Sequence, residues 1–254
     1  MRLLSDDHLP EPARAALERA RALPMSYGVR RYVTPGDRPR TLVVLGEAHM
    51  KMEEASKVGH DVVDAFGLRG VETFQTKKVF AGRMLAFLLM GPRRILRALS
   101  FGRIKDSTIV DAKQLGHGFT VEIEKSQPIP FSLHVGAAYL TVFFAVLWTH
   151  FILTALGMTE AARSPFTLLV LAFELHFLAL LPAILLRRHS WAWLIHPVVA
   201  IVTVRDRMMA NGTVQMLSDH PEAQSAVVVM GRAHLPGFER ELVDLHGFRR
   251  LSDG

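Results

Sequence analysis

Two long apolar stretches dominate the pattern of hydrophobic and polar positions. Residues 131–157 contain no Asp, Glu, Lys or Arg, and residues 165–186 contain only Glu174. Each stretch exceeds the roughly 20 residues that a helix needs to cross a bilayer. The short segment between them, Gly157 to Ser164, is the turn. The pattern therefore predicts a transmembrane helical hairpin over residues 131–187.

On either side of this hairpin, the pattern is typical of a soluble α/β domain. The apolar runs 42–45 and 227–230 predict buried strands, and each is followed by Gly-x-Ala-His, as Gly46–His49 and Gly231–His234. Apolar residues at helical spacing predict a helix after each histidine. The expected elements are helices over 11–23, 52–66 and 236–246, a strand over 68–74, and a β-hairpin formed by 27–34 and 40–45.

The repeated order of strand, Gly-x-Ala-His and helix predicts the fold class. We expect an α/β fold in which two related β-α halves form one domain, with the transmembrane hairpin inserted between them. The first half covers residues 1–130 and the second covers 188–254. The apolar segment Trp191 to Val204 is short for a span, so we expect an interfacial segment or a buried helix there. Two spans leave His49 and His234 on the same side of the membrane.

The charges bear on topology and partners. The chain has a net charge of +6, and arginines and lysines flank both outer ends of the hairpin, which predicts a multi-pass protein of the cell membrane with its domain on the cytoplasmic face. The basic amphipathic stretch Lys77 to Lys105 either lies on anionic lipid or packs on the domain with solvated arginines. We expect the lipid bilayer as a partner and no nucleic acid. The sequence leaves the oligomeric state open.

Polar residues inside the apolar stretches form a second candidate site. Folding the hairpin about residue 161 brings His150 close in depth to Glu174. We expect this intramembrane polar pair to share a hydrogen bond as a structural clamp, with an intramembrane proton or ion site as the alternative.

Metal chemistry is the main hypothesis for the two strand ends. The chain has no cysteine, so a metal would be held by histidine and carboxylate. His49, His234 and Glu72 form a ligand set that suits Mn²⁺, Co²⁺, Zn²⁺ or Fe²⁺ and leaves a position for water. Glu47 is a second acidic candidate, as ligand or general base. The alternative is that the two histidines cap their helices or bond to the backbone, and that Glu47 is a carboxylate at a helix N-terminus.

These motifs resemble the TraB/PrgY/TIKI family. The resemblance rests on the two GxxH motifs, with motif glycines Gly46 and Gly231, on Val71-Glu72 between them, and on the stretch from Arg205 to Ala210. It also includes the segment from Met230 to Gly237. The Gly-Glu form of the first motif is similar to erythromycin-esterase/ChaN-like proteins.

The resemblance implies a membrane-anchored, metal-dependent hydrolase, peptidase-like, that uses Mn²⁺ or Co²⁺ and acts on a peptide or protein. It implies that His49, Glu72 and His234 are metal ligands or catalytic residues, and that Arg205 orients a carboxylate or an oxyanion. For Arg205, an ion pair with Asp206 or a lipid contact stays open. The alternative function is a non-catalytic membrane protein that binds or sequesters a peptide signal, and a transporter-like role through Glu174 and His150 is a third hypothesis.

Overall fold

The computed structural model describes residues 9–48, 51–75, 78–100, 104–105, 107–187, 189 and 191–251. The chain divides into two compact units. The sheet unit consists of Met1–Phe74, Leu96–Gln127 and Asp206–Gly254, and the hairpin unit consists of Gln75–Ile95 and Pro128–Arg205.

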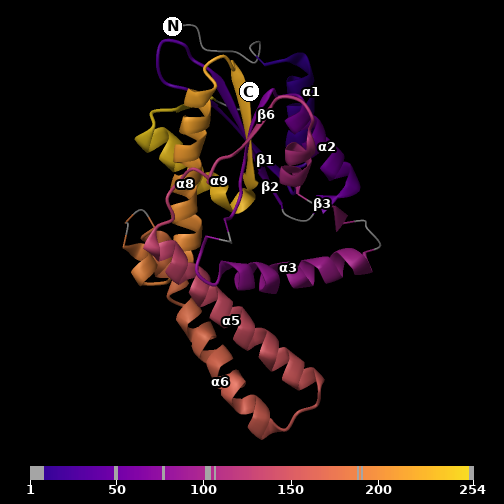
Figure 1. The fold of residues 1–254 in the computed structure, drawn as a ribbon, viewed down its shortest axis with the longest axis vertical. Coiled ribbons are helices and arrows are strands. Elements are labelled where there is room, and N and C mark those ends of the chain that lie inside the picture. The colour runs from indigo at the N-terminus through magenta and orange to yellow at the C-terminus, as the bar shows by residue number, and fades with distance from the viewer. Residues whose placement is uncertain are drawn as a thin grey trace. The chain divides into compact units, whose positions relative to one another are not determined.

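A mixed six-stranded sheet forms the centre of the sheet unit (Figure 1). Its order is β6-β4-β7-β2-β1-β8, where β6 to β2 run parallel and the last two strands are antiparallel to their neighbours. The strands are β1 (Tyr27–Val33), β2 (Thr41–Glu47), β4 (Leu68–Val71), β6 (Phe119–Glu122), β7 (Ser225–Gly231) and β8 (Arg249–Arg250). A second, two-stranded sheet pairs β3 (Lys51–Met52) with β5 (Ile104–Lys105).

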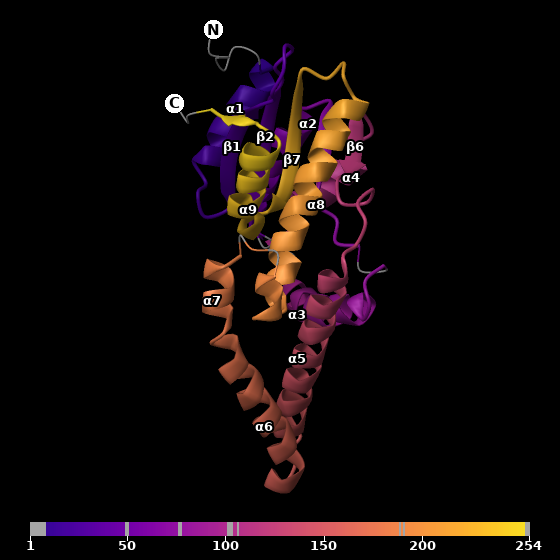
Figure 2. The same cartoon turned by 90° about the vertical axis from the view of Figure 1, so that its left-hand side faces the viewer.

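Helices cover both faces of the large sheet. On one face, α1 (Glu11–Arg21), α2 (Glu53–Asp64) and α4 (Thr108–Gln114) bury a core around Val43, Leu45 and Phe66. The other face, toward the viewer in Figure 2, carries α9 (Leu235–Arg240) and the part of α8 (Val198–Asp219) from Asp206 onward. These helices bury a core around Met209 and Phe238. A π-helical turn, Glu241–Leu245, follows α9. Both faces of β2 and β7 are buried, which explains why these strands are continuously apolar.

The expected β-hairpin is confirmed. β1 pairs with β2 from Tyr27 opposite Glu47 to Val33 opposite Thr41. The expected strand over 68–74 ends at Val71, so Glu72 lies just beyond β4. The helix after His234 begins at Leu235, and Gly247, with φ of 69°, follows the helical segment. β2 contains Gly46 and Glu47 of the first Gly-x-Ala-His segment, β7 ends at Gly231 of the second, and the two strands are parallel neighbours.

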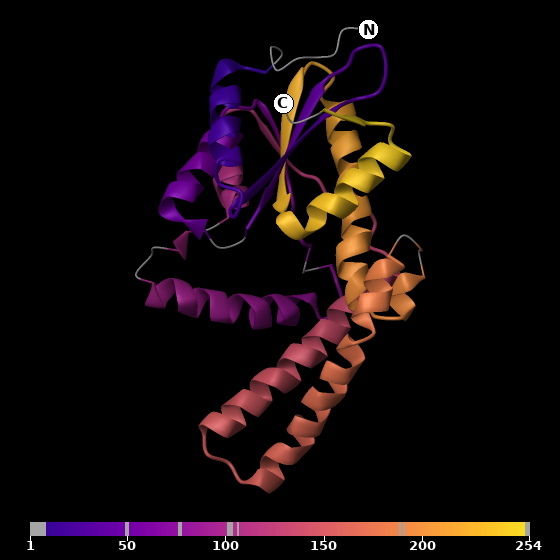
Figure 3. The same ribbon diagram turned by 180° about the vertical axis from the view of Figure 1, so that it is seen from behind.

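The hairpin unit contains two antiparallel apolar helices, α5 (Phe131–Ala155) and α6 (Glu160–Phe177) (Figure 3). The short helix α7 (Leu180–Leu185) continues from α6. By length and composition, α5 and the segment Glu160–Leu185 could each cross a membrane, and few of their residues are buried. This exposure distinguishes them from the core helices of a soluble domain, which bury most of their residues.

The remaining helices pass from one unit to the other. The helix α3 (Gly82–Leu99) lies inside the expected basic amphipathic stretch. The apolar segment 191–204 forms a short 3₁₀ helix, Ala192–Leu194, and then the start of α8 (Val198–Asp219). Part of that segment is thus the first turns of a long helix that continues to Asp219.

The register of the hairpin differs from our expectation for His150 and Glu174. Nδ1 of His150 lies 3.3 Å from the hydroxyl of Thr167, whereas Glu174 is exposed. The cause is the length of the turn. Because α5 ends at Ala155 and α6 begins at Glu160, the helices fold about residues 157–158 rather than 161. Thr167, and not a residue beside Glu174, therefore lies at the depth of His150.

Candidate functional site

The carboxyl ends of the parallel strands bring together residues that are far apart in the sequence. Glu47 ends β2 and lies opposite Gly231, the last residue of β7. Glu72 follows β4, and its N–H donates to the carbonyl of Val229 at 2.9 Å. Because carboxyl ends of parallel strands meet at one edge of the sheet, this edge is where α/β folds build sites.

The imidazole of His234 lies between two carboxylates at this edge. Its Nδ1 is 2.7 Å from Oδ1 of Asp206, and its Nε2 is 3.6 Å from Oε1 of Glu72. The side chains of His234 and Glu72 are each 9% exposed, and that of Asp206 is 1% exposed. A carboxylate only accepts hydrogen bonds, so we assign the Nδ1 proton to the contact with Asp206. In the neutral ring, the lone pair of Nε2 then points toward the side of Glu72.

Glu72 is held by the end of β7. The backbone N–H of Gly231 donates to Oε2 of Glu72 at 2.5 Å, while Oε1 is the oxygen nearer His234. A charged acceptor strengthens such a hydrogen bond. One motif therefore supplies both the histidine and the backbone donor that positions the carboxylate beside it.

Gly237, three residues after His234, has a position that leaves no room for a side chain. A Cβ atom at this position would collide with the carboxylate of Asp206. The carboxylate that holds Nδ1 of His234 thus lies directly against the backbone of α9. Three residues of the segment 231–237 therefore build the site together. Gly231 donates its N–H to Glu72, His234 supplies the imidazole, and Gly237 leaves space for the carboxylate of Asp206.

Gly46 has a packing role. Any side chain there would collide with Leu235, the residue that follows His234. Leu235 therefore packs on the bare backbone of β2, and the glycine of the first motif lets the helix of the second motif approach the sheet.

Glu47 accepts hydrogen bonds at the N-terminus of another helix. Its Oε1 accepts from the hydroxyl of Ser107, and its Oε2 accepts from the N–H of Thr108 at 3.0 Å. The same hydroxyl of Ser107 caps α4 through the N–H of Ile109. Glu47 is 1% exposed. A carboxylate at a helix N-terminus was one of the two interpretations open from the sequence, and the helix concerned is α4 rather than the one that follows Glu47.

Tyr27 lies in the same buried environment. Its hydroxyl donates to the carbonyl of Ala55 at 2.6 Å. Burial raises the pKa of Tyr27 to about 12, opposed by a hydrogen bond with Thr108 and reinforced by the negative charge of Glu47.

Two buried carboxylates were not singled out as site residues from the sequence. Asp206 was named only as an ion-pair partner for Arg205, and Glu124 was not proposed for the site. Oε2 of Glu124 accepts from the N–H of Thr73 at 2.9 Å, and Glu124 is buried like Asp206. A signal for Asp206 existed in the sequence, because Asp206 lies in the stretch from Arg205 to Ala210 that carries part of the family resemblance.

Two further predicted site residues, His49 and Arg205, are not among the described residues of the sheet unit. His49 lies outside the described residues. Arg205 is buried and belongs to the hairpin unit. Within the described ranges, no group of three or more histidine or acidic side chains has an arrangement that could hold a metal ion.

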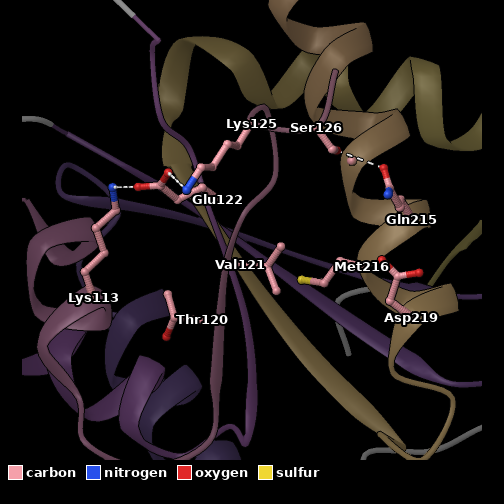
Figure 4. A pocket seen from close by; sticks show the side chains of 10 residues that line it. Lys113, Thr120, Val121, Glu122, Lys125, Ser126, Gln215, Met216 and Asp219 are labelled. Carbon is pink, nitrogen blue, oxygen red and sulfur yellow. Dashed lines mark hydrogen bonds and ion pairs between the residues drawn. The ribbon is translucent and has the colours of Figure 1, made fainter. Parts of the chain in front are cut away.

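A groove of about 650 Å³ lies beside β6. Figure 4 shows Glu122 of this groove between two lysines, with its carboxylate 2.6 Å from Nζ of Lys113 and 3.8 Å from Nζ of Lys125. These lysines hold the pKa of Glu122 below its usual range, chiefly through the hydrogen bond with Lys113. Lys113 also donates to the hydroxyl of Thr73 at 3.0 Å. This bond connects Lys113 of the groove to the residue that follows Glu72 in the sequence.

Comparison with protein-family models, with curated proteins and with solved structures found no match to this chain.

Proposed function

We propose that this protein is a membrane-anchored, metal-dependent hydrolase of the TraB/TIKI type, peptidase-like in its substrate. The observation that carries the proposal is the imidazole of His234, held at Nδ1 by Asp206 and facing Glu72 at Nε2. A carboxylate on the far nitrogen is the usual support for a metal-binding histidine, because it fixes the tautomer and makes the ring more basic.

Two described donors are spaced to share a divalent metal. Nε2 of His234 and Oε1 of Glu72 converge to 3.6 Å, a separation that allows both atoms to bind one ion. His49, which follows Ala48 in the sequence, is the proposed third ligand. Imidazole and carboxylate together suit Mn²⁺ or Co²⁺, with Zn²⁺ and Fe²⁺ as alternatives. When bound, the metal would lower the pKa of a water molecule and polarise a carbonyl.

The neighbouring residues take distinct roles in this proposal. Glu72 is proposed either as a metal ligand through Oε1 or as the base, because that oxygen lies next to Nε2 of His234 while Oε2 accepts from the N–H of Gly231. Glu47 is the alternative base, and its two oxygens accept from Ser107 and Thr108. Arg205 remains the proposed cation for a substrate carboxylate or an oxyanion.

A peptide substrate is supported by the groove beside β6. Among the described strands β6 forms one edge of the large sheet, and such an edge can accept an extended chain as an added strand. The groove has the size of a ligand-binding pocket. Through Lys113 and Thr73 it leads toward the carboxyl ends of the strands, so a bound peptide would run toward Glu72.

The hairpin is the proposed membrane anchor. We infer a multi-pass protein of the cell membrane, with the sheet unit on the cytoplasmic face, because basic residues flank the outer ends of the hairpin. We also infer that the two strand–Gly-x-Ala-His segments are related halves of one domain. Their positions on parallel neighbouring strands support this.

The test is metal analysis of the full chain purified in detergent. Wild type should hold a divalent metal, and His49→Ala/His234→Ala should lose it, whereas the exposed-histidine control His60→Ala/His117→Ala should retain it. Wild type loaded with Mn²⁺ or Co²⁺ should cleave peptides. No bound metal, or equal metal in the double variant and the control, contradicts the proposal. Metal-dependent peptide binding without cleavage would favour the non-catalytic peptide-binding function.

A further inference from the structure

An apolar face of the hairpin unit is exposed at the start of α3. Phe80 is 71% exposed, Met84 is 56% exposed and Phe87 is 72% exposed. Met84 and Phe87 are three residues apart in α3 and lie on one side of it, and Phe80 precedes the helix by two residues. Leu85, on the opposite side of α3, is buried. Three large apolar side chains exposed close together in the sequence indicate a surface that a lipid phase or another molecule covers.

This face is fixed to α5 by a sharp corner. Ala81 has a φ of 56°, a left-handed conformation that is uncommon for any residue except glycine. The N–H of Phe80 donates to Nδ1 of His134 at 3.0 Å, and the hydroxyl of Thr141 donates to the carbonyl of Ala81 at 3.4 Å. The start of α3 is therefore anchored on the same helix that is proposed to span the membrane. From this corner, α3 runs in a different direction from α5 (Figures 1 and 3).

The charge of residues 75–105 indicates which kind of surface would cover this apolar face. Residues 75–105 contain no Asp or Glu. They contain basic residues throughout: Lys77, Lys78, Arg83, Arg93, Arg94, Arg97, Arg103 and Lys105. A helix with aromatic and apolar side chains on one face and only positive charge suits the boundary between acyl chains and anionic headgroups.

We infer that α3 lies in the plane of the membrane on an anionic leaflet, with Phe80, Met84 and Phe87 inserted at the level of the headgroups. The partner is an anionic phospholipid surface. Lys78 and Arg83, which flank the apolar face in sequence and are exposed, contact the phosphates. The inference rests on the hairpin crossing the membrane, which is part of the proposed function, but it is independent of the metal and of hydrolysis.

Single nitroxide labels test this inference cleanly because the chain has no cysteine of its own. The full chain is reconstituted into phosphatidylcholine vesicles with and without phosphatidylglycerol, and the label at Phe87→Cys is the reporter. Leu171→Cys in α6 serves as the bilayer control. Lys57→Cys in α2, whose side chain is 73% exposed, serves as the water control. The measurement compares accessibility to oxygen with accessibility to a water-soluble nickel chelate.

With phosphatidylglycerol, the label at position 87 should lie between the two controls in depth. In Lys78→Gln/Arg83→Gln, the ratio of labels inserted in the membrane to labels exposed to water should fall roughly fivefold for each charge removed. A label at 87 as water-accessible as that at 57, with 171 in the bilayer, overturns this inference alone. If the label at position 87 lies equally deep without phosphatidylglycerol, the requirement for anionic lipid is overturned. Spin–spin broadening between labels at position 87 of two copies would assign the apolar face to a second copy of the chain instead. A label at 171 in water overturns the membrane anchor and this inference with it.

Discussion

The carboxylate of Asp206 lies 2.7 Å from Nδ1 of His234, and both side chains are at least nine-tenths buried. Asp206 and His234 come from different helical segments, α8 and the 3₁₀ turn that follows β7. The contact fixes the orientation of an imidazole whose other nitrogen faces Glu72. If the site holds a metal, Asp206 acts as a positioning residue for the ligand and touches neither metal nor substrate.

Replacing Asp206 should therefore weaken metal binding without removing a ligand. We expect Asp206→Ala to lower the affinity for Mn²⁺ by about 10- to 100-fold, the usual cost of losing the partner of a ligating histidine. Asp206→Asn should lose less, since its amide oxygen can still accept from Nδ1. Calorimetric titration of the metal-free protein measures this, and Asp219→Asn, an exposed change on the same helix, is the control. Equal affinities for all variants would remove Asp206 from the site.

Gly237 should be intolerant of even the smallest side chain. A methyl group in Gly237→Ala would collide with the carboxylate of Asp206, so either the helix or the carboxylate must move. We expect a loss of about 1–3 kcal/mol in the free energy of unfolding, together with weaker metal binding. Gly116→Ala, where a Cβ would meet no atom within 4 Å, is the matched control for thermal unfolding in detergent. A Gly237→Ala protein that unfolds at the temperature of that control would contradict this packing.

The sequence predicted the elements well wherever burial is periodic or continuous. The apolar runs of β2 and β7, the β1–β2 hairpin and the helix after His234 are all present, because apolar residues must be buried whatever the topology. The adjacency of β2 and β7 could not be read from the pattern. It depends on which strands pair across about 180 residues of chain.

The candidate site was predictable only in part, for a physical reason. His234 and Glu72 were predicted to lie together and do so at 3.6 Å. Asp206 and Glu124 were missed because a carboxylate in a sequence is usually solvated, and only the fold reveals that these are buried with partners. The centre of the turn was predicted at residue 161, whereas the helices fold about residues 157–158, because the length of a turn is weakly encoded. Since a shift of the centre moves the opposite residue by twice as much, the expected partner of His150 became Glu174 instead of Thr167.

Stability at high pH should depend on Tyr27. Its pKa is raised to about 12 in the folded protein, while the unfolded chain titrates near 10. A raised pKa means that the folded state holds the proton longer, so its stabilisation is complete below pH 10 and is lost as the pH rises toward 12. The loss is on the order of 2 kcal/mol. Denaturant unfolding of Tyr27→Phe should show a shallower decline over this range than wild type, and parallel declines would contradict it.

The hairpin should tolerate loss of Glu174 better than loss of the Tyr139 hydroxyl. The hydroxyl of Tyr139 lies 2.7 Å from Nδ1 of His176, whereas Glu174 is exposed. We expect Tyr139→Phe to destabilise the protein by about 1 kcal/mol and Glu174→Gln to leave it unchanged. Thermal unfolding in one detergent compares the two. A larger effect for Glu174→Gln would restore the intramembrane site.

Glu47 should matter for stability more than for metal chemistry. Its carboxylate accepts from the hydroxyl of Ser107 and the N–H of Thr108 in a buried environment. Glu47→Ala would leave both donors without this acceptor, at a cost of about 1–3 kcal/mol in the free energy of unfolding. Ser107→Ala removes one of these bonds and the cap of α4, for about 1 kcal/mol. We expect both variants to bind Mn²⁺ with wild-type affinity at temperatures where they remain folded, whereas Glu72→Gln should lose affinity with little loss of stability. Weaker binding in Glu47→Ala with Ser107→Ala unaffected would instead assign Glu47 to the metal centre, because only the first change removes the carboxylate.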